Sequence, residues 1–244
     1  MARILVTGSA DGLGRLAAAT LLDAGHDVVV HARDRARLTA LDELTGRGAV
    51  AVVGDLAVPA ETIALAERIE ACGPFDAVIH NAGVYRGAAI LPVNVVAPYL
   101  LTAAVPRPAR LVYLSSGMHL GGRARLDGLD WSGRRPTATY SDSKLLVTVL
   151  AAAVARRWPD VFANAVDPGW VPTRMGGPDA PDDLHLGHLT QEWLATSAEP
   201  AARTSGGYWH HQQRRPAHPA VQDETFQDAL LHELAACTGI ALPD

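Results

Sequence analysis

Lysine is almost absent from this chain: among 21 basic side chains in 244 residues, only Lys144 is a lysine. Negative charge exceeds positive charge, because the chain has 26 acidic side chains and a formal net charge of −5. No basic field for binding nucleic acid is therefore expected. Cysteine occurs only at Cys72 and Cys237, which cannot form a disulfide framework and are typical of small buried residues in a reducing compartment.

Long apolar runs are also missing. The longest, residues 145–155, is interrupted by Thr148 and is far shorter than the roughly 20 residues of a membrane span. The first residues, MARILVTG, lead directly into an apolar segment, so no signal peptide is expected. With 19% charged and 48% apolar residues, the composition is that of a folded, cytoplasmic protein. The length fits one large domain, predicted to cover residues 1–244.

Short apolar segments rich in β-branched residues alternate with helical patterns. Strands are predicted at 3–8, 27–32, 49–55, 76–83, 110–116 and 162–168, with a last one near 207–211. Helices are predicted at about 14–24, 34–45, 59–72, 90–105, 139–157 and 223–236. This alternation predicts a doubly wound parallel sheet, a three-layer α/β/α Rossmann fold, with ligands at the carboxyl ends of the strands.

The segment 174–222 differs from the rest, because it is rich in Pro, Gly, His and Asp and has little periodicity. We interpret it as an insertion that covers the substrate. Its large apolar side chains, with Trp170 just before it, fit either an apolar pocket or the core of a helical flap. These residues are Trp170, Met175, Leu184, Leu186, Leu189 and Trp193.

Glycines follow the first predicted strand in TGSADGLG, residues 7–14, and a helical pattern begins after them. Gly8, Gly12 and Gly14 would let the backbone turn sharply and allow a pyrophosphate to approach the helix N-terminus, where free N–H groups favour anions. A structural turn is the alternative reading. The position between a strand and a helix favours a dinucleotide site.

The second predicted strand ends at His31-Ala32-Arg33. An acidic residue usually holds the ribose of NAD at this point, whereas an arginine suits the 2′-phosphate of NADP. Arg33 therefore favours NADP(H) over NAD(H), against the alternative of a solvated basic helix start. Asp11, inside the glycine loop, offers nothing to a phosphate.

Tyr140 and Lys144 lie four residues apart in TATYSDSKLLVTVL and share one face of a predicted helix. An ammonium about 4 Å from the tyrosine hydroxyl would favour the tyrosinate by on the order of 4 kcal/mol, or roughly three pKa units. Such a pair can exchange a proton with an alcohol or carbonyl oxygen near neutral pH. A surface tyrosine packed on a lysine stem is the structural alternative.

Taken in order, the motifs TGSADGLG (7–14), NAG (81–83), YLSSG (113–117), YSDSK (140–144) and PGWVPT (168–173) resemble the short-chain dehydrogenase/reductase family. The match runs from residue 3 to about residue 173. Within the family, the chain resembles retinol-dehydrogenase-like and carbonyl-reductase-like members. The resemblance implies that Tyr140 is the acid/base, that Lys144 binds the nicotinamide ribose and lowers the pKa of the tyrosine, and that Ser116 rather than Ser115 binds the substrate oxygen. Asn94 would help to hold a proton-relay water.

The resemblance also extends the expected cofactor site. Its residues would be Gly8, Ser9, Gly12, Leu13, Gly14, Arg33, Asp55, Leu56, Asn81, Ala82, Gly83, Tyr140, Lys144, Pro168, Gly169, Val171 and Thr173. The implied activity is NADP(H)-dependent interconversion of a small-molecule carbonyl, an aldehyde or ketone with a lipophilic body, and the corresponding alcohol. A cofactor-binding sensor, or an epimerase or dehydratase on the same fold, is the alternative.

Two spacings depart from the family. Ser116 and Tyr140 are 24 residues apart, which is longer than common, whereas only 13 residues separate Asn81 from Asn94. The second departure puts the place of Asn94 in doubt and changes one wall of the site. The predicted helix 139–157 is apolar nearly all round, so a homodimer or larger homo-oligomer is expected through it.

Other chemistry has weaker support. Ten histidines invite a metal site, but His185, His188, His210 and His211 lack a convergent third ligand, and no metal is expected. No hydrolase motif accompanies Ser115 and Ser116. We interpret His119 as a loop or pocket residue.

Overall fold

A computed structural model describes residues 1–243, in which one eight-stranded sheet has the order β3-β2-β1-β4-β5-β6-β7-β8. All neighbouring strands are parallel except the antiparallel pair β7 and β8. The strands are β1 (Arg3–Val6), β2 (Asp27–Ala32), β3 (Val50–Val53), β4 (Ala77–His80), β5 (Arg110–Leu114), β6 (Phe162–Asp167), β7 (Tyr208–His210) and β8 (Gln213–Arg215). The predicted doubly wound fold is confirmed, and strand order reverses beside β1, where such sheets bind ligands.

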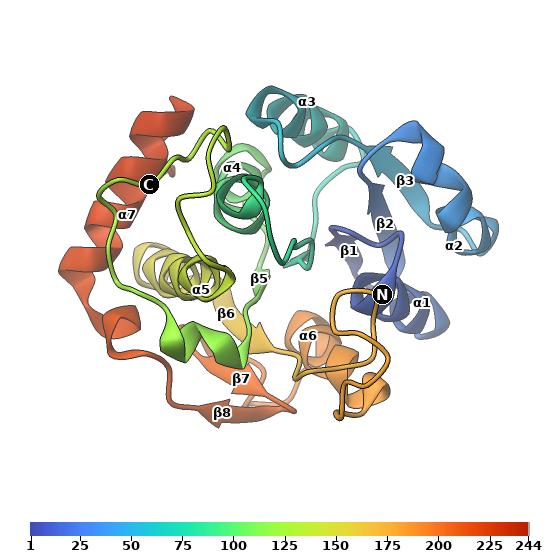
Figure 1. Cartoon of the computed structure of the whole chain (residues 1–244). Coiled ribbons are helices and arrows are strands. Elements are labelled where there is room, and N and C mark those ends of the chain that lie inside the picture. Colours follow the sequence, from blue (N-terminus) through green and yellow to red (C-terminus); the bar gives the residue numbers. More distant parts are fainter. Residues whose placement is uncertain (244) are drawn as a thin grey trace.

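Helices cover both faces of the sheet (Figure 1). They are α1 (Gly12–Asp23), α2 (Asp42–Gly46), α3 (Pro59–Glu70), α4 (Ala97–Ala104), α5 (Tyr140–Arg157), α6 (Leu184–Thr196) and α7 (Glu224–Thr238). One face carries α3, α4, α5 and α7, and the other carries α1 and α6 (Figure 1). This is the three-layer arrangement expected from strands that are apolar on both sides.

The two cores follow the pleat of the central strands. In β1, Leu5 points into the core beneath α3, α4 and α5, whereas its neighbours Ile4 and Val6 point into the core beneath α1 and α6. All three side chains have 0% exposure, as a strand covered on both faces requires. The sheet is therefore rigid where its carboxyl edge presents the loops of the site.

Segment 174–222 contains more regular structure than its sequence predicts. Besides the expected β7, it forms the helix α6, the edge strand β8 and a 3-10 helix at Pro219–Gln222. Trp193, for which a pocket and the core of a helical flap were both open, packs edge to face on Trp209 with ring centroids 5.2 Å apart. Only the first part of this segment approaches the site.

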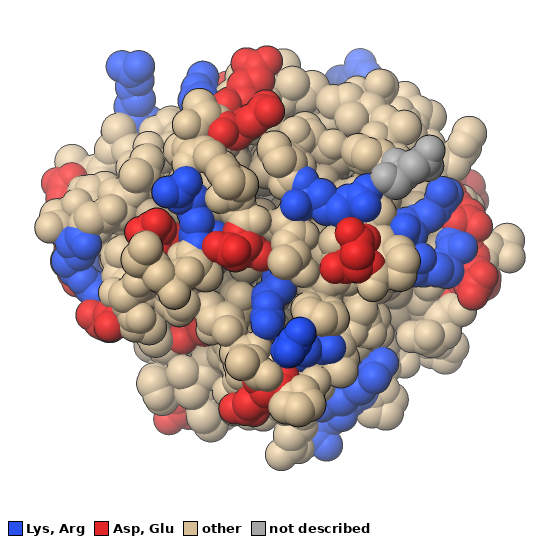
Figure 2. Space-filling model, turned by 180° about the vertical axis from the view of Figure 1, so that it is seen from behind, with Lys and Arg blue, Asp and Glu red and all other residues tan. Residues whose placement is uncertain are grey.

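Charged side chains are mixed in sign on the face opposite to that of Figure 1 (Figure 2). No continuous field of positive charge covers this face. Among the described residues, no helix is long and apolar enough to cross a membrane.

Candidate active site

A cavity of about 580 Å³ opens at the carboxyl edge of the sheet. Most of the sequence-predicted cofactor residues line it: Gly8, Gly12, Leu13, Arg33, Asp55, Leu56, Asn81, Ala82, Gly83, Tyr140, Lys144, Pro168 and Thr173. Ser9, Gly14, Gly169 and Val171 do not. The cavity extends from the end of β2, past the glycine loop, to the start of α5.

Close packing explains the glycines of the first loop. Gly8 has φ +67°, and a Cβ there would lie 2.9 Å from the Cα of Ala82. A Cβ on Gly14 would lie 2.2 Å from the amide nitrogen of Asn81, which donates to the carbonyl of Thr7 at 2.9 Å. These glycines hold the loop after β1 directly against the NAG segment after β4, so both can line one cavity.

Ser9 has a structural task in this loop instead of facing the cavity. Its buried hydroxyl donates to the carbonyl of Val6 and accepts from the backbone N–H of His31 at 3.1 Å. The hydroxyl of Ser9 is therefore bonded within the protein, and Ser9 does not line the cavity. Ser9 instead ties the glycine loop to the end of β2.

His31 is a cavity residue that sequence reasoning missed. Its Nδ1 accepts from the N–H of Gly8 at 3.0 Å, and its Nε2 lies 2.8 Å from the carbonyl of Gly54. Burial lowers the pKa of His31, so the ring is neutral, with its proton on Nε2. The neutral imidazole joins the ends of β1, β2 and β3 beneath the cavity.

Arginines gather at the end of the cavity beside β2. Arg33 is exposed and pairs with Asp34 at 3.2 Å, while Arg37 lies 3.7 Å from Asp11. Arg174 reaches Asp11 from the loop after β6, at 3.8 Å. In the sequence, the negative charge of Asp11 counted slightly against a phosphate site. In the structure, two arginines offset that charge.

Tyr140 is the first residue of α5, and the helix start fixes its place. Thr139 is the N-cap, accepting from the N–H of Asp142 at 3.1 Å, while the carboxylate of Asp142 accepts from the N–H of Thr139 at 2.9 Å. This reciprocal capping box satisfies two otherwise free donors. Lys144 follows one turn later, with Nζ 5.4 Å from the centroid of the Tyr140 ring.

The two serines after β5 point in different directions. The Ser115 hydroxyl is buried and bonds the hydroxyl of Thr148 at 2.6 Å, within the body of the protein. The Ser116 hydroxyl instead accepts from the N–H of Met118 at 3.2 Å and lies near the Tyr140 side chain. Ser116 is thus the serine beside the tyrosine, whereas Ser115 is the serine that lines the cavity.

Burial dominates the ionisation of the tyrosine. It raises the pKa of Tyr140 to about 12, although the hydrogen bond from Ser116 favours the ionised form. Asp167 raises this pKa further. The sequence predicted a pKa lowered by Lys144; in the chain without cofactor, burial raises the pKa of Tyr140 instead.

Lys144 is 4% exposed, and its Nζ donates to the carbonyl of Leu114 at 2.7 Å. Burial lowers the pKa of Lys144 to about 8, and the charge of Asp167 opposes this shift. The lysine therefore carries its charge at neutral pH, inside the protein and at the floor of the cavity.

Known proteins are similar to this chain over its whole length. The model of the short chain dehydrogenase family matches residues 2–105. A short-chain dehydrogenase from Gibberella zeae is 35% identical, with 100% of this chain and 99% of the relative covered. The chain belongs to the short-chain dehydrogenase family. An uncharacterized oxidoreductase from Emericella nidulans is 37% identical over 100% of this chain and 99% of its own.

Two further members of the family bear on the sequence predictions. Human retinol dehydrogenase 13 is 27% identical, covering 98% of this chain and 85% of its own, which agrees with the retinol-dehydrogenase-like resemblance. A short chain dehydrogenase from Escherichia coli CFT073, whose crystal structure is complexed with NADPH, is 26% identical with a TM-score of 0.68. The match covers 87% of this chain and 97% of that one.

The side-chain amide of Asn94 is buried and bonded within the protein. It lies in a one-turn π-helix, Pro92–Val96, before α4, and is 2% exposed. Its Oδ1 accepts from the N–H of Val84 at 2.8 Å, and its Nδ2 donates to the carbonyl of Val84 at 3.0 Å and to the hydroxyl of Ser143 at 2.9 Å. The amide thus joins the shortened segment after β4 to α5 and does not line the cavity.

The loop after β6 contributes less uniformly than predicted. Met175 lines the cavity, whereas Trp170 is 60% exposed and does not line it. Val171 is instead buried, and Gly169 donates its N–H to Asp167 at 3.0 Å. Sequence reasoning named this loop but could not tell which side chains face inward.

Several histidines contact a side chain close to them in the sequence. His188 bonds Glu192 one helical turn away, and the rings of His210 and His211 stack with centroids 3.8 Å apart. Within residues 1–243, no group of three or more His, Cys, Asp or Glu side chains is arranged to hold a metal ion.

Proposed function

We propose that this short-chain dehydrogenase is an NADP(H)-dependent oxidoreductase that interconverts an aldehyde or ketone with the corresponding alcohol. The observation that carries the proposal is the grouping of Tyr140 and Lys144 in one cavity, with the buried ammonium 5.4 Å from the centroid of the tyrosine ring and the Ser116 hydroxyl near the Tyr140 side chain. An oxygen placed between the two hydroxyls would be both polarised and within reach of a proton.

The cavity suits a dinucleotide along its length. The glycine loop presents its backbone and the N-terminus of α1 to a pyrophosphate. Gly8 and Gly14 must be glycines there, because side chains at these positions would collide with the NAG segment. Asp55 and Leu56 would flank the adenine, Asn81 to Gly83 would lie along the cofactor, and Pro168 and Thr173 would border the nicotinamide. When bound, NADPH supplies the two electrons of the reduction.

Arg33 and Arg37 favour NADP(H) over NAD(H). Both line the cavity beside the end of β2, where a 2′-phosphate would lie. A guanidinium can form two parallel hydrogen bonds with a phosphate. The NADPH bound by the Escherichia coli member of the family is in keeping with this preference.

Tyr140 acts as the proton donor in the direction of reduction. With a pKa near 12 its hydroxyl is protonated throughout the neutral range. Ser116 donates to the substrate oxygen and orients it. The charge of Lys144 stabilises the negative charge that develops on that oxygen and on the tyrosine as the proton moves.

The surroundings of the site complete the proposal. Residues 168–183, the loop between β6 and α6, would cover the bound substrate. The free thiols of Cys72 and Cys237 are in keeping with a cytoplasmic protein. Self-association through α5 was expected from its apolar surface, but α7 covers that surface in the same chain. We therefore propose that the chain acts as a monomer.

The test is oxidation of NADPH, followed at 340 nm, with aldehydes and ketones from small aliphatic to polycyclic aromatic ones. NADH is run in parallel. Turnover of at least one carbonyl with NADPH, and at least tenfold lower kcat/KM with NADH, is expected. Binding of NADPH without turnover across the panel would contradict the proposed activity and favour a sensor.

A further inference from the structure

Charge is distributed unevenly along the cavity. At the end beside β2, each arginine has an acidic partner: Asp34 for Arg33, and Asp11 for both Arg37 and Arg174. Arg86 lines the other part of the cavity and is exposed. Within residues 1–243 it has no ion pair with a carboxylate.

Tyr85 connects Arg86 with the proposed acid. The ring of Tyr85 packs against that of Tyr140 with centroids 4.8 Å apart and planes tilted by 49°. The guanidinium carbon of Arg86 lies 5.9 Å from the centroid of the Tyr85 ring. Tyr140, Tyr85 and Arg86 thus form a row that begins at the reacting hydroxyl and ends in a positive charge.

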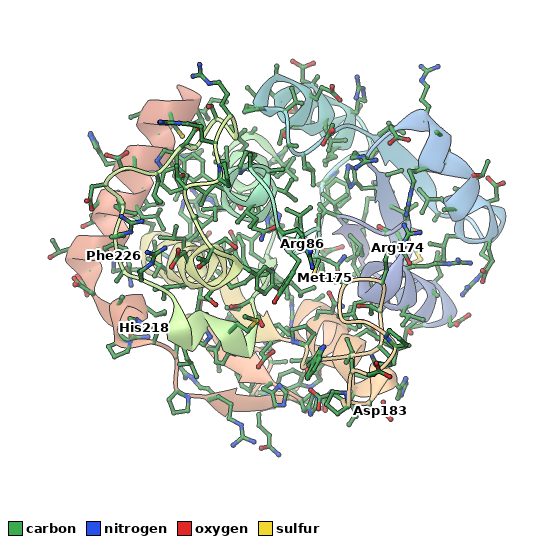
Figure 3. All side chains as sticks on the ribbon, viewed as in Figure 1. Arg86, Arg174, Met175, Asp183, His218 and Phe226 are labelled. Carbon is green, nitrogen blue, oxygen red and sulfur yellow. The ribbon has the colours of Figure 1, made fainter. Side chains whose placement is uncertain are left out.

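The side chains around this row are apolar. Tyr85 is 43% exposed and Met175, which lines the cavity from the loop after β6, is 46% exposed. Figure 3 shows Arg86 beside Met175 near the middle of the view, while Arg174 lies farther out, toward α1. An exposed aromatic ring and a thioether favour contact with a flat, apolar ligand.

No acidic side chain competes for Arg86 within the cavity. The acidic residues that line it are Asp11 and Asp55, and Asp11 already faces Arg37 and Arg174. Asp55 accepts from the N–H of Ala57 at 2.9 Å, in the loop after β3. Arg86 is thus free to pair with an anion brought in by the ligand.

We infer that the substrate is an aromatic carbonyl compound that carries a carboxylate, with its ring on Tyr85 and its carboxylate on Arg86. This inference rests on the proposed function and adds the class of substrate. When the carbonyl oxygen lies at Tyr140, a ring stacked on Tyr85 directs a substituent on its far side toward the guanidinium. The planar fork of arginine suits a carboxylate in two-point contact.

The kinetic test compares 4-formylbenzoate with its methyl ester, and 4-acetylbenzoate with its methyl ester. The enzymes are the wild type, Arg86→Gln, Arg86→Lys and the control Arg125→Gln, an exposed arginine outside the cavity. In the wild type and in Arg125→Gln, the acids are expected to have kcat/KM about tenfold or more above their esters, through a lower KM. Arg86→Gln removes that preference and Arg86→Lys keeps part of it, with the KM for NADPH unchanged.

Calorimetry separates this inference from the proposed function, since it needs no turnover. The enzyme with NADPH bound is titrated with 2-naphthoate and 2-naphthamide. Binding of the acid about tenfold or more tighter than the amide, lost in Arg86→Gln, supports the assigned carboxylate site even when no carbonyl is reduced. Equal affinities for acid and amide, or an Arg86→Gln variant whose only defect is weaker binding of NADPH, would overturn the inference.

Discussion

Tyr140 and Lys144 are shifted in opposite directions by the same cause. Burial disfavours a charged side chain, so it raises the pKa of Tyr140 to about 12 and lowers that of Lys144 to about 8. Asp167, at the end of β6, raises both values through its negative charge. The free chain therefore keeps the tyrosine protonated and the lysine charged at neutral pH, which suits donation of a proton to a carbonyl oxygen.

The pH dependence of kcat/KM for NADPH reports the ionisation of the free enzyme. This parameter is expected to be constant from pH 6 to 7.5 and to fall above about 8, where Lys144 loses its proton. Because Asp167 raises the pKa of Lys144, Asp167→Asn should move that fall to lower pH. Asp127→Asn, an exposed carboxylate elsewhere, should leave the profile unchanged. A profile identical in wild type and Asp167→Asn would contradict this role of Asp167.

The proposed role of Arg33 in the preference for NADPH over NADH can be measured with a single substitution. Charged hydrogen bonds contribute about 1.5–3 kcal/mol, so Arg33→Ala should raise the KM for NADPH roughly 10- to 100-fold. The KM for NADH should change less than threefold, because NADH lacks the 2′-phosphate. Arg35→Ala, an exposed neighbour outside the cavity, serves as the control. An equal effect of Arg33→Ala on both cofactors would remove Arg33 from the phosphate site.

Residue patterns singled out Tyr140, Lys144, Gly8 and Gly12, which line one cavity, because their spacing relative to strands and helices is itself informative. They did not predict His31, whose two ring nitrogens bond Gly8 and Gly54 across three strands. Nor did they predict the row from Tyr140 through Tyr85 to Arg86, since it joins the start of α5 to the loop after β4. That VYR follows NAG directly, at the end of a central strand, was the one local signal.

At the scale of elements, the start of α5 fixes the reacting hydroxyl. Asp142 caps the helix through Thr139 and also accepts from the backbone and guanidinium of Arg123, at 2.9 Å and 2.7 Å. Burial works against its charge, but these hydrogen bonds hold the pKa of Asp142 below its usual value. One carboxylate thus joins the long loop after β5, which carries Ser116, to the helix that carries Tyr140.

The pKa of Asp142 is lower in the folded than in the unfolded chain. The stability that it confers is therefore present above the unfolded pKa, near 4, and is lost as the pH falls through the lower folded value. Asp142→Asn should lower the free energy of unfolding by about 2 kcal/mol at pH 7 and weaken its decline between about pH 4 and pH 2. Urea unfolding across this range measures both, with Asp127→Asn for comparison. An unchanged midpoint at pH 7 would contradict the role of the cap.

Element boundaries show where sequence patterns were insufficient. The predicted helix 90–105 is present from residue 90 to residue 104, but it contains a π-helical turn at Pro92–Val96 before α4, and Asn94 in that turn bonds Val84 and Ser143. The sequence pattern predicted the helix but not its π turn. Helix α6 agrees with the helical flap that was one of two alternatives for its apolar side chains, but its bounds were not predicted, because Pro, Gly and His residues surround it.

On the scale of the whole molecule, the C-terminal segment covers α5. Leu230 and Leu234 of α7 are fully buried, and Arg156 of α5 bonds Gln227 at 2.9 Å and also contacts Asp228. Beyond α7, the carbonyl of Ile240 accepts a hydrogen bond from the hydroxyl of Tyr99 in α4 at 2.7 Å. The apolar surface that predicted an oligomer is thus already buried within one chain.

Light scattering at micromolar concentration is expected to give the mass of one chain. Deleting residues 223–244 should expose the covered side of α5, so the shortened protein should form larger species or fail to fold. A stable dimer of the full-length protein that persists on dilution to nanomolar concentration would contradict the monomer. The surface responsible would then lie away from the face that α7 covers.

The most direct measurement of the whole account is turnover by Tyr140→Phe at saturating NADPH, with NADPH binding measured by fluorescence in the same sample. The substitution removes one oxygen and leaves the ring against Tyr85 and the ammonium of Lys144 in place. The account predicts binding of NADPH within about threefold of wild type and a loss of kcat of at least about 10²-fold. Full turnover by Tyr140→Phe would show that another group supplies the proton and would contradict the proposed chemistry.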